Sequence, residues 1–92
     1  MTISKRVLDA LQIMVEIALK SDVSTLDCVV DSGSHLKNTW RLITKNPATG
    51  EETVVTDLPE DPLSILVRDG YIERINEVTY HLLPTAFEVF GH

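Results

Sequence analysis

The positions of glycine and proline constrain this chain more than any other feature of its sequence. All four glycines and all four prolines lie between segments with apolar periodicity, and none occurs before Gly33. Because these residues end helices and form turns, they divide the 92 residues into one long N-terminal segment and several short elements. A chain of this length forms one small domain, so we expect residues 1–92 to share one core.

Residues 4–20 are predicted to form a long amphipathic helix. Apolar residues recur at helical spacing, namely Val7, Leu8, Leu11, Met14, Val15 and Ala18. Ala10, Ile13 and Ile17 widen this apolar arc beyond the roughly 100° that a surface helix needs. Either the helix is central to its own domain, or Ile13 and Ile17 face a second subunit.

The middle of the chain is predicted to contain a β-hairpin near residues 39–58. Two segments, 39–44 and 53–56, are rich in strand-forming residues, and Asn46, Pro47 and Gly50 supply the turn between them. The alternative is a helix over residues 34–45, because Leu36, Trp40 and Ile43 share helical spacing. Residues 21–35 are compatible with either a short helix or a strand.

The last third of the chain is predicted to alternate short helices and strands. Asp61 and Pro62 begin a helix over residues 62–69, which ends at Gly70 and points Leu63, Leu66 and Val67 inward. Two strands then form a hairpin over residues 71–82, and Pro84 begins a short C-terminal helix. The chain is therefore expected to be an α+β domain.

Residues 63–90 resemble the closing part of a winged helix-turn-helix domain. The resemblance lies in the helix that ends at Gly70, in Tyr71-Ile72 at the start of the next strand, and in Tyr80-His81-Leu82 before the last helix. The helix at 4–20 is compatible with the first helix of that family. The hairpin at 39–58 would be an insertion, since it does not match the family's second helix. The resemblance implies a winged-helix-like fold and DNA binding through a recognition helix and a wing.

The sequence contains no motif typical of catalysis or of cofactor binding. It has no glycine-rich phosphate loop and no pair of cysteines or histidines at metal-ligand spacing. We therefore expect no enzyme activity, no cofactor, no metal ion and no small-molecule substrate. Cys28 lies among apolar residues, as a buried, inert thiol would. A single cysteine and the lack of an apolar run of about 20 residues favour a cytoplasmic protein that does not enter a membrane.

The charge distribution leaves two binding hypotheses, of which the first is a DNA-binding transcriptional regulator. Residues 1–46 hold six basic and five acidic residues, a balance of +1, whereas residues 47–92 hold two basic and nine acidic residues, a balance of −7. A helix over residues 34–45 would carry the basic face that phosphate contacts need. The candidate DNA-binding residues are Lys37, Asn38, Arg41, Lys45, Arg68 and Arg74.

The second hypothesis is a regulatory protein-interaction module that binds a protein partner or a second copy of itself as a homodimer. Glu51, Glu52 and Asp57 would face a basic partner. Ile13 and Ile17, or alternatively Ile65, would form the apolar centre of the interface. We favour this hypothesis over DNA binding, because Glu60 and Asp61 at the start of the helix over residues 62–69, and Glu77 at the tip of the wing, would repel phosphate.

Overall fold

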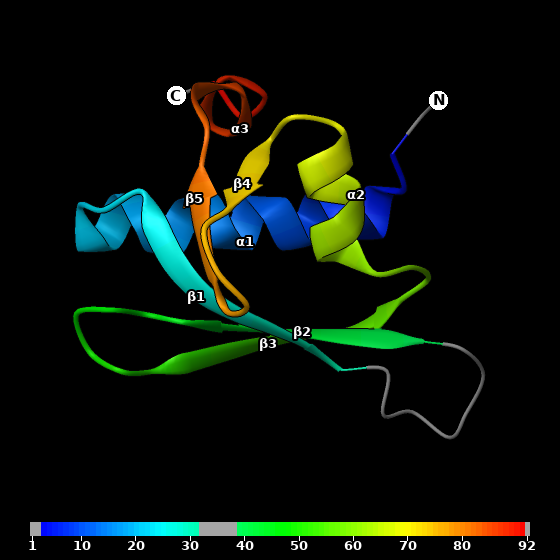
Figure 1. Cartoon of the computed structure of the whole chain (residues 1–92), viewed down its shortest axis with the longest axis horizontal. Coiled ribbons are helices and arrows are strands. Elements are labelled where there is room, and N and C mark those ends of the chain that lie inside the picture. The colour runs from blue at the N-terminus through cyan, green and yellow to red at the C-terminus, as the bar shows by residue number, and fades with distance from the viewer. Residues whose placement is uncertain (1–2, 32–38, 92) are drawn as a thin grey trace.

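In the part of the chain that the structure describes, five strands form one antiparallel sheet and three helices pack against it (Figure 1). The structure is a computed structural model, and it describes residues 3–31 and 39–91. Its elements are α1 (Lys5–Ser21), β1 (Thr25–Asp31), β2 (Trp40–Lys45), β3 (Glu52–Leu58), α2 (Pro62–Arg68), β4 (Ile72–Arg74), β5 (Thr79–Leu82) and α3 (Pro84–Glu88). The strand order is β3-β2-β1-β5-β4. The expected α+β class is confirmed.

Helix α1 is central to the core of this chain. Ser4 begins the helix, since its Oγ accepts a hydrogen bond of 3.2 Å from the backbone N–H of Arg6. Asp22 ends it in the left-handed conformation, with φ of 55°. The buried residues of α1 are Val7, Ala10, Leu11, Met14, Val15, Ile17 and Ala18. They join buried residues of the other two helices and of all five strands in one cluster. In Figure 1, α1 runs behind β1, β4 and β5.

Strands β2 and β3 form the predicted hairpin, and the turn chemistry explains why. The side-chain oxygen of Asn46 accepts hydrogen bonds from the backbone N–H groups of Ala48 at 2.8 Å and Thr49 at 3.3 Å. Gly50 adopts the left-handed region with φ of 78°, which a residue with a side chain enters at a cost. The hairpin prediction is confirmed.

The helix alternative for residues 34–45 is wrong for residues 40–45. Strand β2 pairs with β1 on one side and with β3 on the other, so its backbone groups are used in the sheet. Lys37 and Asn38 lie outside the described residues, as does the rest of segment 32–38. The open choice for residues 21–35 is resolved as a strand over Thr25–Asp31.

Helix α2 begins and ends where the sequence predicts. The carboxylate of Asp61 accepts hydrogen bonds from the backbone N–H groups of Leu63 at 3.1 Å and Ser64 at 3.4 Å. Gly70, with φ of 83°, follows the helix. One inward residue was predicted wrongly: Val67 is 39% exposed, whereas Ile65 is 7% exposed. The helix packs against both α1 and β4, and this position buries Ile65 and leaves Val67 at the rim.

The predicted hairpin at 71–82 is also present, and it completes the sheet. The side-chain oxygen of Asn76 accepts hydrogen bonds from the backbone N–H groups of Val78 at 3.0 Å and Thr79 at 2.9 Å, which forms the turn between β4 and β5. Strand β5 pairs with β1, so the two hairpins share one sheet. Helix α3 begins at Pro84 and places Ala86 in the core.

Candidate interaction surface

One face of strands β1, β2 and β3 points away from the helices. Side chains alternate along each strand, and the inward ones, such as Leu26, Leu42 and Val55, join the core that α1, α2 and α3 cover. The outward ones lie on what we call the outer sheet face. Its residues are Asp27, Val29 and Asp31 on β1, Arg41, Ile43 and Lys45 on β2, and Glu52 and Val54 on β3.

The strand register arranges the outer sheet face in three rows. Val29 is opposite Ile43, and Ile43 is opposite Val54, so three β-branched side chains form an apolar row across the sheet. On one side of it lie Asp27, Lys45 and Glu52, which are also in register. On the other side Asp31 is opposite Arg41. The face is therefore an apolar row between two charged rows.

Both cations of the outer sheet face lie beside carboxylates. The guanidinium of Arg41 forms an ion pair with the carboxylate of Asp31 across the strands. Lys45 lies in register between Asp27 and Glu52, and Asp27 also accepts a hydrogen bond of 3.0 Å from the hydroxyl of Thr79. Three carboxylates and two cations give this face a formal charge of −1, so it does not present the positive field that a phosphate backbone requires.

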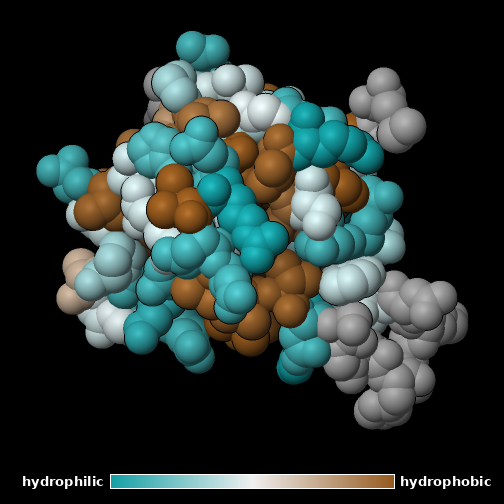
Figure 2. Space-filling model, in the orientation of Figure 1, coloured by the Kyte–Doolittle hydropathy of each residue, from teal (hydrophilic) through white to brown (hydrophobic). Residues whose placement is uncertain are grey.

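The apolar row is open to solvent at its two ends, and Ile43 between them is half-buried. Val29 is 48% exposed and Val54 is 50% exposed, and the nearby turn between β4 and β5 exposes Ile75 and Val78 as well. Figure 2 shows hydrophobic surface in the lower middle of the view, where Figure 1 draws β1, β2 and this turn. Contiguous apolar surface rimmed by polar residues is typical of an interaction site.

The structure separates the predicted DNA-binding residues into two groups. Arg41 and Lys45 lie on the outer sheet face. Arg68 and Arg74 line a shallow hollow of about 280 Å³ with Tyr80, whose side chain faces the core. Arg68 forms an ion pair with Asp69 at 3.1 Å, and this pair raises the pKa of Arg68. The cations predicted to share one helix face therefore do not do so among the described residues.

The predicted protein-interface residues are also distributed differently from the prediction. Ile17 is 9% exposed and Ile65 is 7% exposed, while Ile13 is partly buried against the core, so these three do not form an exposed apolar centre. The physical reason is that α1 packs against β1, β3, α2 and α3, so its wide apolar arc is covered within the chain. Glu51, Glu52 and Asp57 are exposed at or beside β3, an edge strand of the sheet.

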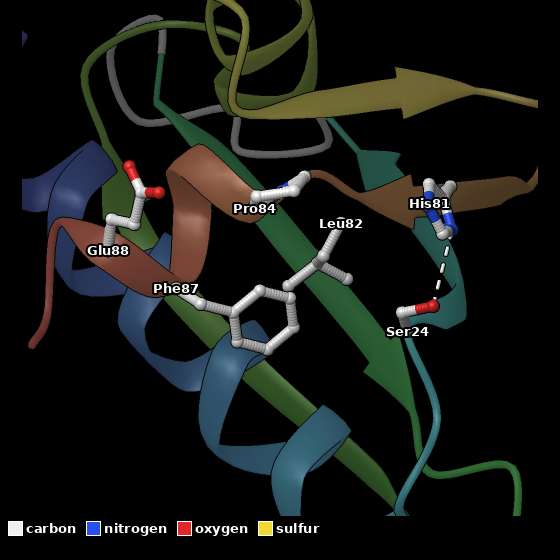
Figure 3. A pocket seen from close by; sticks show the side chains of 6 residues that line it. All are labelled: Ser24, His81, Leu82, Pro84, Phe87 and Glu88. Carbon is white, nitrogen blue, oxygen red and sulfur yellow. Dashed lines mark hydrogen bonds between the residues drawn. The ribbon is translucent and has the colours of Figure 1, made fainter. Parts of the chain in front are cut away.

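A second hollow, of about 410 Å³, lies beside α3 and contains a serine and a histidine (Figure 3). The Oγ of Ser24 is 3.4 Å from Nδ1 of His81, and the Oγ1 of Thr25 is 3.3 Å from the same nitrogen. Figure 3 shows Glu88 on the far side of Phe87 from His81. Among the described residues no carboxylate accepts a hydrogen bond from this imidazole, so the arrangement is not that of a hydrolytic triad.

Cys28 is buried on the inner face of β1, as predicted for an inert thiol. Its sulfur lies 3.8 Å from the hydroxyl oxygen of Thr44. Burial raises the pKa of the Cys28 thiol to about 11 from an ordinary value of 9.0, and the hydrogen bond to Thr44 offsets only part of that rise. The thiol is therefore protonated at neutral pH.

We expect the free energy of unfolding to fall between about pH 9 and pH 11 because of Cys28. In this range the unfolded chain releases the thiol proton and the folded chain keeps it, so rising pH favours unfolding by up to about 3 kcal/mol. Urea unfolding measured from pH 8 to pH 11 checks this. The Cys28→Ala variant should lose less stability over the same range, and equal losses in the two proteins would contradict the assignment.

Residues 3–31 and 39–91 contain neither a cluster of metal-ligating side chains nor a helix that could span a membrane. No group of three or more His, Cys, Asp or Glu side chains in these ranges could hold a metal ion. No helix of the described chain has both the length and the apolar character needed to cross a membrane. Comparison with protein families, with curated proteins and with solved structures found no match to this chain.

The apolar row was not among the predicted features, although the sequence contains a signal for it. Three apolar doublets occur in the strand regions, at Val29-Val30, Leu42-Ile43 and Val54-Val55. Because neighbouring residues of a strand point to opposite faces, a doublet places one apolar side chain in the core and one outside it. The register aligns the three doublets, so their outward members meet in one row.

Proposed function

We propose that this chain is a small, non-catalytic binding module that acts in regulation through protein–protein interaction at the outer sheet face. The observation that carries the proposal is the exposed apolar row Val29–Ile43–Val54, flanked by charged rows. An apolar centre with a polar rim is the usual anatomy of a protein interface. Burying the row against a partner would remove apolar side chains from water. This stabilises the complex by about 25 cal/mol for each Å² of apolar surface buried.

The fold that we propose is winged-helix-like with an inserted hairpin. In support, α1 precedes β1, and α2 is followed by the β4–β5 hairpin and then by α3. Strand β5 pairs with β1, which ties that hairpin to the first strand. The hairpin β2–β3 is the proposed insertion, and it provides two of the three strands of the outer sheet face.

DNA binding has less support than protein binding. Residues 40–45 form a strand, so Arg41 and Lys45 do not lie on a helix that could enter the major groove. Each of them has a carboxylate opposite it in the neighbouring strand. Such carboxylates would repel phosphate at the place where cations are needed.

Photo-crosslinking from the outer sheet face tests the proposed function. With a photoreactive amino acid at position 43, we expect a cross-linked product that contains a second protein, because Ile43 is at the centre of the apolar row. The same probe at position 16, on the exposed side of α1, is the matched control and should give no such product. Electrophoresis and mass spectrometry of the products make the comparison.

Two results would overturn the proposal. One is an equal pattern of products from positions 43 and 16, which would mean that the outer sheet face is not preferred. The other is binding of random-sequence duplex DNA near physiological salt that weakens steeply as salt is added, without a protein product from position 43.

A further inference from the structure

Strands β1 and β2 carry matching patterns of opposite charge on the outer sheet face. On β1 the outward residues are acidic, apolar and acidic, at Asp27, Val29 and Asp31. On β2 they are basic, apolar and basic, at Lys45, Ile43 and Arg41. The register places each acid directly opposite a base, and Val29 opposite Ile43. A surface that complements itself in this way is the requirement for a two-fold symmetric interface.

We infer that the partner of the outer sheet face is a second copy of this chain. The inference rests on the proposed function and names the partner. The two sheets pack face to face, with the two-fold axis parallel to the strands and midway between β1 and β2. This axis places β1 of one copy over β2 of the other at the same level along the strands. Each carboxylate of β1 then lies over a cation of the partner, and Val29 lies over the partner's Ile43.

The charges select this axis over its alternatives. An axis centred on β2 would place Arg41 over the partner's Arg41 and Lys45 over the partner's Lys45. An axis perpendicular to the strands through the apolar row would place Lys45 over the partner's Arg41. Like charges in contact across an interface repel each other, so both arrangements are disfavoured. With the axis midway between β1 and β2, the carboxylate of Asp31 in each copy lies over the guanidinium of Arg41 in the other. The two ion pairs then meet with opposite charges in contact.

Association through the sheet edge is disfavoured by the acidic residues of β3. Strand β3 is an edge strand, and edge strands are prone to pair with another chain. Glu52 and Asp57 lie near opposite ends of β3, so antiparallel pairing of two β3 strands would bring their carboxylates together. The residues that were predicted to attract a basic partner thus protect the β3 edge against pairing with a second copy.

The proposed dimer is small, and this sets the concentrations at which it forms. Strands lie about 4.8 Å apart and rise about 3.3 Å per residue, so the rows cover on the order of 300 Å² of each sheet in projection. An interface of this size is smaller than the roughly 1,200 Å² of total buried surface typical of stable complexes, so the dimer is a weak one and we expect a dissociation constant on the order of micromolar or weaker.

Charge reversal at Asp31 and Arg41 tests the dimer. Sedimentation equilibrium should show a monomer–dimer equilibrium for the unaltered chain. Asp31→Arg should weaken association about tenfold or more, because four cations would then meet at the axis. The double variant Asp31→Arg with Arg41→Asp restores opposite charges, so it should regain most of the lost affinity. It should not associate with the unaltered chain, because its reversed charges meet like charges there.

Glu16→Arg is the matched control, since it changes the net charge as Asp31→Arg does but lies on the exposed side of α1. It should leave association unchanged, and circular dichroism should show that all variants are folded. The inferred dimer is wrong if the unaltered chain stays monomeric at several hundred micromolar, or if Glu16→Arg and Asp31→Arg weaken association equally. If position 43 then cross-links to a different protein, the proposed function survives without the dimer. If it cross-links to none, both fail.

Discussion

Replacement of Leu42 by aspartate is expected to unfold this protein. Leu42 is fully buried at the centre of β2, where its side chain belongs to the cluster shared by the sheet and the helices. The substitution removes the apolar contacts of a core leucine and introduces a carboxylate without a partner. Together these effects cost more than about 4 kcal/mol. Single domains are stable by only about 5–15 kcal/mol, so circular dichroism should show a largely unfolded chain at 37 °C.

The neighbouring substitution Ile43→Asp is the matched control. It introduces the same charge one residue further along the strand, on the outer sheet face. Because the side chain of Ile43 is not buried in the core, we expect the chain to remain folded with a loss of no more than about 1 kcal/mol. The outer sheet face depends on Leu42 and Ile43 pointing to opposite sides of β2. Similar losses of stability from both substitutions would contradict this arrangement. A folded Ile43→Asp variant would also lack the centre of the proposed interface.

Local sequence signals were sufficient to predict most elements of the fold, with β1 as the exception. The cap at Asp61, the turn at Asn46 and the left-handed glycines at positions 50 and 70 each act through atoms a few residues away. Such signals depend little on the rest of the molecule, which is why the elements they delimit were predicted correctly. The segment that forms β1 had no comparable signal. It is a strand because its backbone pairs with β2 and with β5.

The candidate site could not be predicted in the same way, because it depends on the strand register. Val29, Ile43 and Val54 are far apart in the sequence and become neighbours only when three strands align. Conversely, Ile17 and Ile65 are apolar as interface residues are, but both are buried in the core of the chain itself. An apolar arc on a helix predicts that something will cover it. It does not predict whether the cover is another part of the chain or another molecule.

The central position of α1 leads to the second large effect: Leu11→Ala should destabilise the protein strongly. Leu11 is fully buried in the helix that packs against β1, β3, α2 and α3. Truncating a core leucine to alanine removes its transfer free energy and leaves a cavity, at a cost of about 2–5 kcal/mol. For a domain of this size, each kcal/mol lowers the melting temperature by about 4–8 °C. We therefore expect a decrease of roughly 10–30 °C in thermal unfolding.

Gln12→Ala is the control for Leu11→Ala, because Gln12 is the next residue of the same helix and is exposed. Alanine has a high helix propensity, so this substitution should change the free energy of unfolding by no more than about 0.5 kcal/mol. Both variants should be measured at concentrations where sedimentation shows monomer, since dimer formation would add to the apparent stability. A loss below about 1 kcal/mol for Leu11→Ala would mean that α1 is not the centre of this core. The apolar arc of α1 would then be available to a second subunit, and the outer sheet face would have a competitor as the binding surface.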